Sequence, residues 1–388
     1  MSKILNMINK LHCNDVQYLE LYKVIKWDTN FSGIDKSWQK EILDTKTNVS
    51  AKRLKELLVD DGNIKLLSTG IFDGYTTLNK FDGVIDEGEI ITIPSGGSAN
   101  IKYYNGKYIN SGNIIGTTID SNKYDLKYIY HCLLNNNSLI QNYFRGSGVQ
   151  HPDMKKIIQI KIPIPPIEVQ KEIVIILDKF GELEAELEAE LEAELEARKC
   201  QYEFWREKLL SKEYKKLKLK DVLSIKNGKD YKHLENGNIP VYGSGGIMTY
   251  VDDYVYNKPT VLIPRKGSLG NVFYVDTPFW NVDTIYYTEI DESKVVPKYI
   301  YYFIQNKHLD KLNIAGGVPS MTQATLNKIE IDVPSLDEQK RIVSILDKFD
   351  KLVNDITLGI PAEIELRRQQ YEYYRNKLLS FEELSVNE

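Results

Sequence analysis

The chain repeats itself in two pairs of matching segments. Residues 165–180 read PPIEVQKEIVIILDKF, and residues 334–349 read PSLDEQKRIVSILDKF. Further along, QYEFWREKLLS at 201–211 returns as QYEYYRNKLLS at 370–380, and both pairs are separated by 169 positions. Matches of this length in one register indicate an internal duplication, which restricts the chain to folds with two copies of one structural unit.

Each copy begins with the signals of a helix start. The first copy opens with Pro165 and Pro166, and the second opens with Pro334, after which Ser335 and Glu338 have the spacing of a capping box. Apolar residues then recur at heptad spacing, which predicts a seam between two helices. These positions are Ile173, Ile176, Phe180, Leu183 and Leu187 in the first copy and Ile342, Ile345, Phe349, Leu352 and Ile356 in the second.

The first copy contains a spacer, Glu182–Ala197, built from four ELEA units. Leu, Glu and Ala are strong helix formers and no Gly or Pro interrupts them, so we expect one continuous helix. A period of four differs from the period of about 3.5 in a coiled coil, so the leucine stripe rotates around the helix and suits a spacer better than a core. The second copy has Gly359 and Pro361 in this region, which predict a break.

Two segments of α/β or mainly β texture alternate with these helices. Residues 12–163 and 212–332 are rich in Tyr, Ile, Asn and Gly, with short apolar runs and frequent turn signals. Their starts, LELYKV and LKLKDV, match at an offset of 198, so the first segment has roughly 28 extra residues before residue 89. Weak similarity continues between 89–104 and 260–275, 127–136 and 298–307, and 145–163 and 315–334.

The pattern predicts an α+β fold of two similar α/β domains separated by two long antiparallel helices about a pseudo-two-fold axis. Because Asn9–Leu11 echoes Asn376–Leu379, we expect a circular organisation with neighbouring termini. The predicted boundaries are 1–163 for the first domain, 164–211 for the first long helix, 212–333 for the second domain, and 334–388 for the second long helix with the C-terminal tail.

The charge balance permits a nucleic-acid partner without requiring one. The net charge is −5, but the spacer alone carries eight Glu and no basic residue, so the rest of the chain carries +3. The cysteines Cys13, Cys132 and Cys200 are odd in number and lack metal-site spacing, as expected of reduced thiols in a cytosolic protein. The sequence has no signal-peptide core and no 18-residue apolar run, so we expect neither secretion nor membrane insertion.

The motifs of nucleic-acid enzymes are missing from the sequence. A DNA methyltransferase needs a (D/N)PP(Y/F) loop for the flipped base, and the nearest strings, PIPPI and DTPF, do not match it. The sequence also lacks a GxxxxGK(S/T) phosphate loop, and its five histidines lack zinc-ligand spacing. We interpret GSGG at 243–246 as a turn. The chain is therefore expected to be non-catalytic and to hold no metal.

Two similar domains held at a fixed distance suit the binding of two half-sites on one linear partner. Pseudo-two-fold symmetry in a protein mirrors half-site geometry on DNA, and the spacer then acts as a ruler. One four-residue unit adds about 6 Å of rise, nearly two base pairs at about 3.4 Å each. The alternative is a scaffold that binds other proteins through its helices, and salt-dependent binding to duplex DNA would distinguish the two.

The sequence resembles the specificity subunits of Type I restriction–modification systems. The resemblance rests on PPIEVQKEIVIILDKF, LEAELEAELEAELEARKCQYEFWREKLLS, VPSLDEQKRIVSILDKF and GIPAEIELRRQQYEYYRNKLLS. It is strong in the helices and weak in the two domains. The repeated tetrapeptide before ARK is similar to the class of subunits in which repeat number sets spacer length. The resemblance implies two target-recognition domains, each reading one half of a bipartite sequence in double-stranded DNA.

The resemblance also implies protein partners. These would be two methyltransferase subunits and, in the larger complex, two ATP-driven motor/nuclease subunits. AdoMet, ATP and Mg²⁺ would then be bound by the partners and not by this chain, in agreement with the missing motifs.

Polar and basic residues on glycine-containing loops are the candidates for DNA contact. Arg265 can pair with guanine, Asn100 and Gln150 with adenine, and the lysines with phosphates. For Tyr103, core packing is as good an interpretation as base stacking, and each candidate has the role of an ordinary solvated loop residue as its alternative. The candidates are Ser95, Ser98, Asn100, Lys102, Tyr103, Arg145, Gln150 and His151 in the first domain and Lys229, Tyr231, Lys232, Arg265, Lys266, Ser268, Ser320 and Gln323 in the second.

Aromatic residues near the far end of each long helix exceed what one seam can bury. If they are exposed, they predict a bundle with helices of the methyltransferase subunits; burial against the domains is the alternative. They are Tyr202, Phe204, Trp205, Tyr371, Tyr373 and Tyr374.

Overall fold

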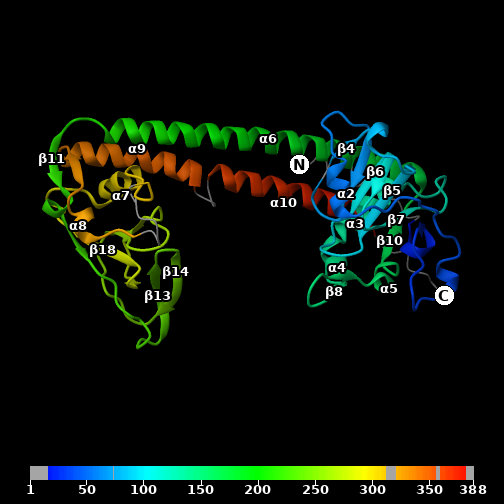
Figure 1. Cartoon of the computed structure of the whole chain (residues 1–388), viewed down its shortest axis with the longest axis horizontal. Helices are drawn as coiled ribbons and strands as arrows, with labels where there is room; N and C mark the ends of the chain where they lie inside the picture. Colours follow the sequence, from blue (N-terminus) through cyan, green and yellow to red (C-terminus); the bar gives the residue numbers. More distant parts are fainter. Residues whose placement is uncertain (1–15, 73, 312–319, 355–358, 382–388) are drawn as a thin grey trace. The chain divides into compact units, whose positions relative to one another are not determined.

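The computed structural model describes residues 16–72, 74–311, 320–354 and 359–381 and has a mixed helix and sheet architecture (Figure 1). The chain forms two compact units. Unit 1 combines Met1–Leu187 with Leu366–Glu388, and unit 2 is Glu188–Glu365. Asn9–Leu11, which the sequence matches with Asn376–Leu379, lies outside the described residues. The long helix α6 (Ile167–Leu210) contributes its first part to unit 1 and its second part to unit 2.

Unit 1 is built on a six-stranded sheet in the order β2-β7-β5-β6-β3-β4. All its neighbouring strands are antiparallel except the parallel pair β3 and β6. The strands are β2 (Ile25–Trp27), β3 (Ile64–Leu67), β4 (Tyr75–Thr76), β5 (Asp86–Pro94), β6 (Lys102–Asn110) and β7 (Asn113–Thr118). Two antiparallel pairs lie outside this sheet, β1 (Gln17–Glu20) with β10 (Lys161–Ile164) and β8 (Phe144–Arg145) with β9 (His151–Pro152).

The long helices are part of the core of unit 1. The shorter helices of the unit are α2 (Ala51–Glu56), α3 (Leu126–Asn135), α4 (Asn137–Gln141) and α5 (Met154–Ile157). One continuous apolar cluster joins one face of the sheet to α3, to the start of α6 and to the end of α10 (Ile360–Leu379). Its buried members include Ile91 and Ile93 of β5, Ile129 and Leu133 of α3, Ile173 and Leu177 of α6, and Leu378 of α10.

Unit 2 repeats this plan with shorter sheets. A four-stranded sheet has the order β12-β18-β15-β16, and a three-stranded sheet has the order β14-β13-β17. The strands are β12 (Leu223–Lys226), β13 (Asn236–Gly243), β14 (Gly246–Val251), β15 (Thr260–Pro264), β16 (Phe273–Val275), β17 (Trp280–Asn281) and β18 (Ile285–Ile290), with a separate pair of β11 (Lys215–Lys218) and β19 (Glu330–Val333). The helices are α7 (Pro297–Asn306), α8 (Gln323–Leu326) and α9 (Leu336–Asn354).

The strand pairings show which main elements of the two units are equivalent. The pair β1–β10 corresponds to β11–β19, with the predicted offsets of 198 and 169. In unit 1 the hairpin β3–β4 runs parallel to β6, and in unit 2 the hairpin β13–β14 runs parallel to β17. The extra residues of unit 1 lie between β2 and β3, where they form a short 3₁₀ helix (Lys36–Trp38) and α2.

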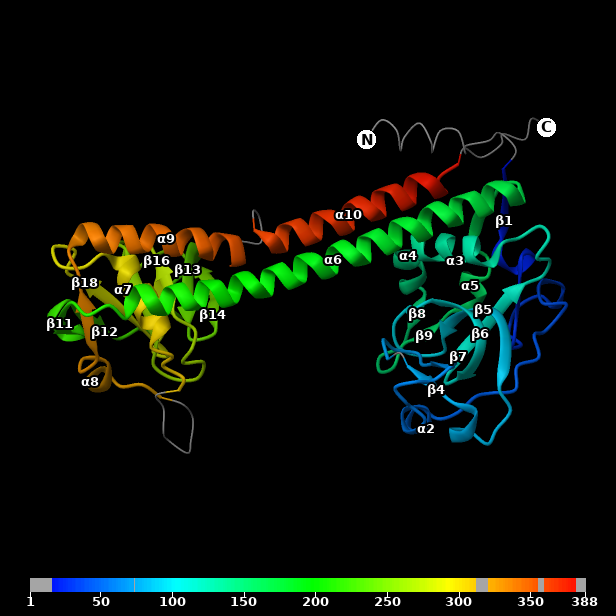
Figure 2. The same ribbon diagram turned by 90° about the horizontal axis from the view of Figure 1, so that it is seen from above.

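The long helices follow the predicted asymmetry. Helix α6 is unbroken over 44 residues, whereas α9 ends at Asn354 and α10 begins at Ile360, with Pro361 in its first turn. Figure 2 shows α10 beside α6. Within unit 1 the two run antiparallel, because Phe180 and Leu187 of α6 line one pocket with Tyr374 and Arg367 of α10.

The predicted heptad seam is only partly confirmed. Ile173 and Ile342 are buried in the cores of their units, and a ring contact joins Tyr202 to Phe349 in unit 2. Leu183 and Leu352, however, are exposed, and Ile356 lies outside the described residues. The seam is shorter than expected because the first turns of α6 and α9 bury much of their apolar face against the α/β domain as well as against the other long helix.

The described parts of the two chain ends meet within unit 1. The hydroxyl group of Tyr18 on β1 donates a hydrogen bond to the carbonyl oxygen of Phe381, just beyond α10, at 2.7 Å. The same strand pairs with β10, which leads directly into α6. Unit 1 is therefore assembled from both ends of the described chain.

Candidate nucleic-acid interface

Three loops of unit 1 meet beside the end of β5. The amide of Ser95 donates to the carbonyl oxygen of Gly112 at 2.9 Å, and the amide of Gly97 donates to that of Gln150 at 2.8 Å. Nδ1 of His151 lies 2.6 Å from the carbonyl oxygen of Ser95. The structure thus brings together the predicted residues Ser95, Gln150 and His151, with Ser98 exposed on the same loop.

Arg145 belongs to this cluster through the short hairpin β8–β9. It is paired with His151 across the hairpin, and both side chains are exposed. Gly146 follows with a φ of +142°, which favours glycine at this turn. A guanidinium group on an exposed turn beside two backbone-anchored loops is suited to contacting phosphate or a guanine edge.

The side chains of two predicted residues of unit 1 already form hydrogen bonds within the protein. Nδ2 of Asn100 donates to the carbonyl oxygen of Gly70 at 2.6 Å, and Nζ of Lys102 donates to those of Ser68 and Gly70 at 2.9 and 2.7 Å. Both side chains support the turn between β3 and β4. Direct base contact by Asn100 would require it to give up this bond, so its position favours a supporting role.

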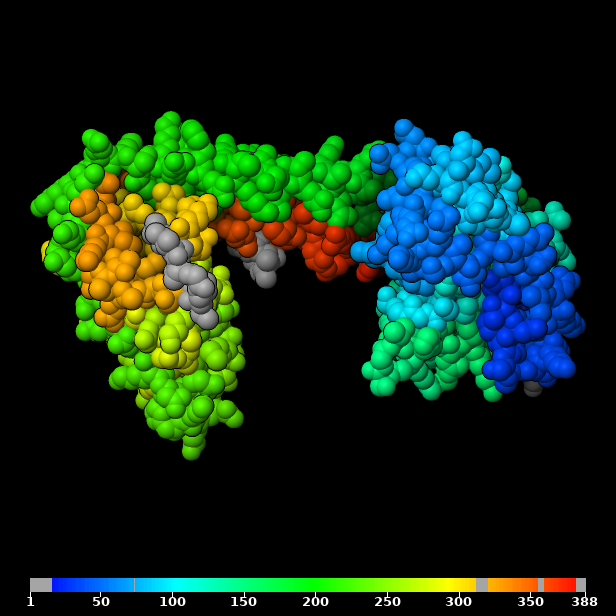
Figure 3. Space-filling view, in the orientation of Figure 1, coloured from blue at the N-terminus to red at the C-terminus, as the bar shows by residue number. Residues whose placement is uncertain are grey.

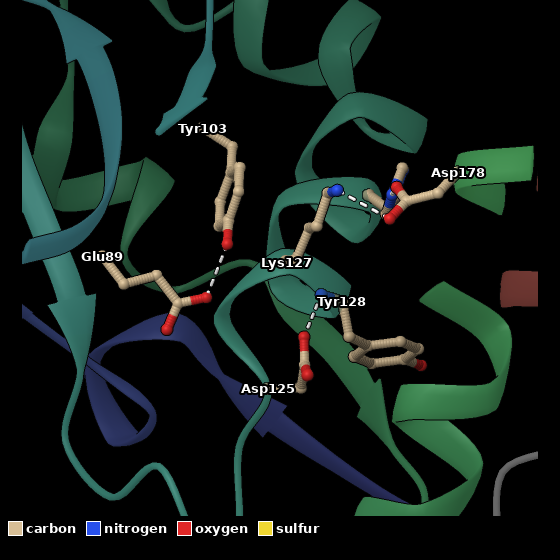
Figure 4. Close-up of polar contacts among 7 residues, drawn as sticks. Glu89, Tyr103, Asp125, Lys127, Tyr128 and Asp178 are labelled. Atoms are coloured by element: carbon tan, nitrogen blue, oxygen red, sulfur yellow. Dashed lines mark hydrogen bonds and ion pairs between the residues drawn. The ribbon is translucent and has the colours of Figure 1, made fainter. Parts of the chain in front are cut away.

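Tyr103 lies away from the loops, on the side of β6 that faces α3. Its hydroxyl group donates to Glu89 at 2.7 Å, and Nζ of Lys127 lies 5.4 Å from its ring (Figure 4). Burial and the neighbouring carboxylate of Glu89 raise its pKa. Of the two interpretations offered by the sequence, these contacts favour packing for Tyr103.

In unit 2 the equivalent loops meet around Thr284. Its carbonyl oxygen accepts from the amides of Arg265 and Lys266 at 2.9 and 3.2 Å, and its side-chain oxygen accepts from the amide of Ser244 at 3.3 Å. Lys266 also forms a bridge with Ser320. The predicted residues Arg265, Lys266 and Ser320 are therefore neighbours, and Ser268 is exposed on the same loop.

The other predicted residues of unit 2 lie on adjoining segments. Gln323, at the start of α8, donates to the side chain of Asn227 at 3.3 Å, and the amide of Lys229 donates to the carbonyl oxygen of Asn281 at 2.8 Å. Lys232 is exposed nearby, whereas Tyr231 packs half-buried against the small core around Val241 and Trp280. These contacts favour a packing role for Tyr231, which its position in a polar loop did not reveal.

The two clusters occupy the same place in the two units. The Ser95-to-Gly112 bond in unit 1 and the Arg265-to-Thr284 bond in unit 2 both tie the end of the equivalent central strand to the turn before the next strand. Unit 2 has the more cationic loop, with Arg265 and Lys266 in sequence. Each cluster presents exposed donors on loops anchored by backbone hydrogen bonds, which suits contact with phosphates and base edges.

Sequence reasoning missed two turns that belong to these clusters. They are residues 68–72 between β3 and β4 and residues 243–246 between β13 and β14. Nδ2 of Asn271 donates to the carbonyl oxygen of Ser244 at 3.1 Å, which fixes the second turn to the loop of Arg265. The GSGG string predicts only a turn, and STGIF at 68–72 has no signal beyond its single glycine.

The clusters are positioned by a joint that is the same in both units. Gln170 of α6 and Gln339 of α9 are fully buried, and each makes three hydrogen bonds to the backbone. Gln170 accepts from the amide of Asp125 and donates to the carbonyl oxygens of Lys123 and Pro165. Gln339 makes the same bonds with Val296, Lys294 and Pro334. The joint therefore fixes each α/β domain to its long helix.

An ion pair repeats beside each glutamine. Lys127 of α3 lies 2.6 Å from Asp178 of α6 (Figure 4), and Lys298 of α7 lies 2.9 Å from Asp347 of α9. Each lysine also lies over a tyrosine ring at 5.4 Å, Tyr103 in unit 1 and Tyr274 in unit 2. These contacts hold α3 against α6 in unit 1 and α7 against α9 in unit 2.

The aromatic residues predicted for partner contact are not all exposed. Tyr202 and Tyr374 are buried in the cores of units 2 and 1, so for these two residues the alternative of burial is the correct one and exposure is not. They are covered because α6 and α10 turn these positions toward the domains. Trp205 and Tyr371 are half-buried. Phe204 and Tyr373, at equivalent positions, are 57% and 52% exposed.

Among the described residues, no group of His, Cys, Asp and Glu side chains could hold a metal ion. Cys132 is buried, which raises the pKa of its thiol to about 12, and Cys200 is exposed; neither forms a disulfide. Cys13 lies outside the described residues. Within the part of the chain that the structure covers, no helix is long and apolar enough to span a membrane.

Comparison with known proteins places the chain in a family. Residues 34–197 and 211–366 each match the family described as Type I restriction modification DNA specificity domain. The chain is 35% identical over 352 residues to the specificity subunit of the type I restriction enzyme EcoR124I/EcoR124II of Escherichia coli, which covers 80% of each chain. It is 34% identical over 366 residues to a candidate type I restriction enzyme specificity subunit of Haemophilus influenzae, covering 86% of this chain and 92% of that one.

Solved structures agree in fold. The S subunit of a type I restriction–modification system from M. genitalium has a TM-score of 0.52 at 19% identity, covering 95% of this chain and 97% of that one. A chain from a structure of a type I R-M system has a TM-score of 0.64 at 14% identity, covering 95% and 98%. With two matched domains in one chain, the protein belongs to the type I restriction–modification specificity subunits, the non-catalytic subunits that carry DNA specificity.

Proposed function

We propose that each unit reads one half of a bipartite DNA target and that the two long helices set the distance between the halves. The observation that carries this proposal is that both units have an equivalent loop cluster and an equivalent glutamine joint to the long helix. The recognition domains would span residues 1–163 and 212–333, with the helices at 164–211 and 334–388. The bond between Tyr18 and Phe381 supports a circular, pseudo-two-fold organisation.

Salt-dependent binding of the purified chain to duplex DNA tests the proposal that the two units bind DNA. Contacts between cationic side chains and phosphates release counterions, so affinity should fall steeply as salt rises. Replacement of Lys266 by Ala should reduce the salt slope, and replacement of the exposed Lys258, away from the cluster, should not. A chain that binds its protein partners but shows no affinity for duplex DNA would be an interaction scaffold instead.

The continuous helix α6 supports the role of its spacer as a ruler. The four ELEA units lie within 44 residues of unbroken helix, and each unit adds about 6 Å. Deleting Leu187–Glu190 should shorten the preferred gap between half-sites by one or two base pairs and leave each half-site unchanged. Genome-wide methylation mapping in cells that carry the shortened subunit measures both the gap and the two half-site sequences. An unchanged gap would contradict the ruler.

Methyltransferase subunits are the partners we infer for the long helices, two of them per chain, with two motor/nuclease subunits in the larger complex. Phe204 and Tyr373 are exposed at positions 169 apart, with Nζ of Lys208 and Lys377 lying 5.4 and 5.9 Å from their rings. An apolar pocket of about 210 Å³ between α6 and α10 in unit 1 adds a cavity for a partner side chain. AdoMet, ATP and Mg²⁺ would be held by these partners.

A pull-down with the F204A/Y373A variant tests the docking. Loss of two exposed aromatic anchors should weaken capture of the methyltransferase by at least tenfold, since such anchors dominate interface energies. Tyr254→Ala, an exposed aromatic outside the helices, is the matched control. Capture of the methyltransferase at the wild-type level by the double variant would rule out this docking surface.

A further inference from the structure

The two equivalent hairpins carry exposed aliphatic side chains. Ile71, on the turn between β3 and β4, is 96% exposed. Ile247 and Met248, which directly follow the turn between β13 and β14, are 50% and 57% exposed. Each hairpin lies at the end of its sheet, since β4 and β14 are the terminal strands in the two strand orders. A single exposed aliphatic residue is ordinary; here one recurs on the equivalent hairpin of both units.

The turn that carries Ile71 is held by side chains from β6 and the loop before it. Lys102 and Asn100 donate to its carbonyl oxygens, and the hydroxyl group of Ser68 donates to the carbonyl oxygen of Phe72 at 2.9 Å. A turn fixed in this way presents Ile71 in a set position. Preorganisation of this kind lowers the entropy cost of binding at the exposed side chain.

The hairpin of unit 2 is anchored to the cationic loop. The amide of Ser244 donates to Thr284, and the carbonyl oxygen of Ser244 accepts from Asn271. A Cβ atom at Gly267, next to Lys266, would lie 3.2 Å from Oγ of Ser244. In unit 1 the turn is equally close to its own cluster, because a Cβ atom at Gly112 would lie 3.2 Å from Cγ2 of Thr69. Both apolar tips therefore adjoin the polar residues of the proposed interface.

The shape of the hairpin suggests what it binds. β13 and β14 lie on the side of unit 2 away from α6 and α9 (Figure 1), and this part of the unit tapers to a narrow end in the space-filling view (Figure 3). The major groove of DNA admits a two-stranded β-ribbon, and the C5-methyl group of thymine is the apolar feature of its floor. The cationic Arg265 and Lys266 beside the hairpin match the phosphates that border such a groove.

We propose that Ile71 and Ile247 read thymine methyl groups in the major groove, one in each half-site. This inference rests on the proposed function of the two units as half-site readers. Ile71 and Ile247 would favour a T·A pair through apolar contact with the methyl group and not through a hydrogen bond. The neighbouring polar loops would contact phosphates and other base edges. Each isoleucine is thereby a specificity-determining residue of its own unit.

The experiment uses the full chain together with its methyltransferase partner and maps methylated sites across the genome. Ile71→Ala should relax one T·A position in one half-site, and Ile247→Ala should relax one in the other, each leaving the opposite half-site unchanged. Leu78→Ala and Tyr254→Ala, which remove exposed side chains elsewhere in units 1 and 2, are the controls and should leave the motif intact.

A second measurement removes the methyl group itself. At the relaxed position, deoxyuridine in place of thymidine should weaken wild-type binding by about 3- to 10-fold, the effect expected for burial of one methyl group, and should leave the alanine variant unaffected. The salt slope of binding should be the same for both proteins, because no phosphate contact is lost.

Three outcomes would overturn the inference. They are an unchanged motif in both alanine variants, relaxation at a position that is not T·A, and equal binding of thymidine and deoxyuridine DNA by the wild type. In each of these cases the wild type still binds DNA, so the proposed function stands. Failure of the wild-type chain to bind any duplex would instead overturn both.

Discussion

Gln170 in unit 1 and Gln339 in unit 2 make the same three hydrogen bonds with equivalent partners. The hairpins that carry Ile71 and Ile247 differ much more. β3 and β4 are joined by two residue pairs, whereas β13 and β14 pair over most of Asn236–Val251, with two register shifts. The comparison indicates that the joint with the long helix tolerates little change, while the elements at the sheet edge are free to vary in length and sequence.

This contrast has a physical basis. A buried side-chain amide that satisfies three backbone groups cannot be replaced without leaving those groups unpaired. An edge hairpin has one strand neighbour and an exposed face, so its length and side chains can change without disturbing the core. Two units with different edge hairpins can therefore have the same joint with their long helices.

Loss of either joint glutamine should produce the largest effect. Gln170→Leu and Gln339→Leu should each lower the free energy of unfolding by about 2–4 kcal/mol, because three backbone groups lose the partner that the buried amide provides. Urea unfolding, with hydrogen exchange at the amides of Asp125 and Val296 as the local report, measures this loss. Gln159→Leu, at an exposed position of unit 1, should have little effect. A large loss in one unit and none in the other would break the equivalence of the joints.

Removing the aspartate of the ion pair beside the joint glutamine should destabilise unit 2 more than unit 1. Asp347 accepts from Lys298 and also from the hydroxyl group of the buried Tyr302 at 2.6 Å, whereas Asp178 has Nε2 of His131 at 3.5 Å in that place. Asp347→Ala should cost about 1–3 kcal/mol because it strands a buried hydroxyl group. Asp178→Ala should cost less, about 0.5–1 kcal/mol, as expected of a half-exposed ion pair.

A double-mutant cycle checks the assignment in unit 2. Tyr302→Phe removes the hydroxyl group that Asp347→Ala would strand, so the double variant should recover part of the stability lost by Asp347→Ala alone. Urea unfolding of the four proteins provides the cycle. Equal losses for the two aspartates, without recovery in the double variant, would show that the hydroxyl bond contributes nothing to the difference.

Local sequence patterns predicted the helical frame well. Ile167 and Leu336, where α6 and α9 begin, are 169 positions apart, as are Leu210 and Leu379, where α6 and α10 end. The break in the second helix followed from one glycine and one proline. Such features depend on the backbone preferences of neighbouring residues, which the sequence displays directly.

What the sequence did not display are contacts between distant segments. Asn100 and Lys102 turned out to support a turn about 30 residues earlier, which requires the parallel pairing of β3 with β6. Tyr202 and Tyr374 are buried because a folded domain covers one side of each helix end. Helical periodicity identifies an apolar face but not what covers it, and no local pattern predicts a parallel strand pair. The hairpin tips were missed for the same reason.

The smallest predicted effect concerns His131, which stands where unit 2 has Tyr302. Burial lowers the pKa of His131 more than the nearby Asp178 raises it, and Lys127 and Arg375 also lower it. The pKa in the folded state is thus below the ordinary value of 6.5, so the unfolded state binds the proton more readily as the pH falls through that value. Unit 1 should therefore lose stability between pH 7 and pH 5, and His131→Tyr should remove that part of the loss.

The reciprocal change sharpens the comparison. Tyr302→His should introduce the same pH dependence into unit 2, because its side chain would be equally buried beside Asp347 and Lys298. Urea unfolding at pH 7 and pH 5 measures the difference, with His151→Gln, an exposed histidine of unit 1, as the control. If wild type and His131→Tyr lost stability equally over this range, the burial of His131 would have no consequence for proton binding, and the two units would be equivalent at this position despite their different residues.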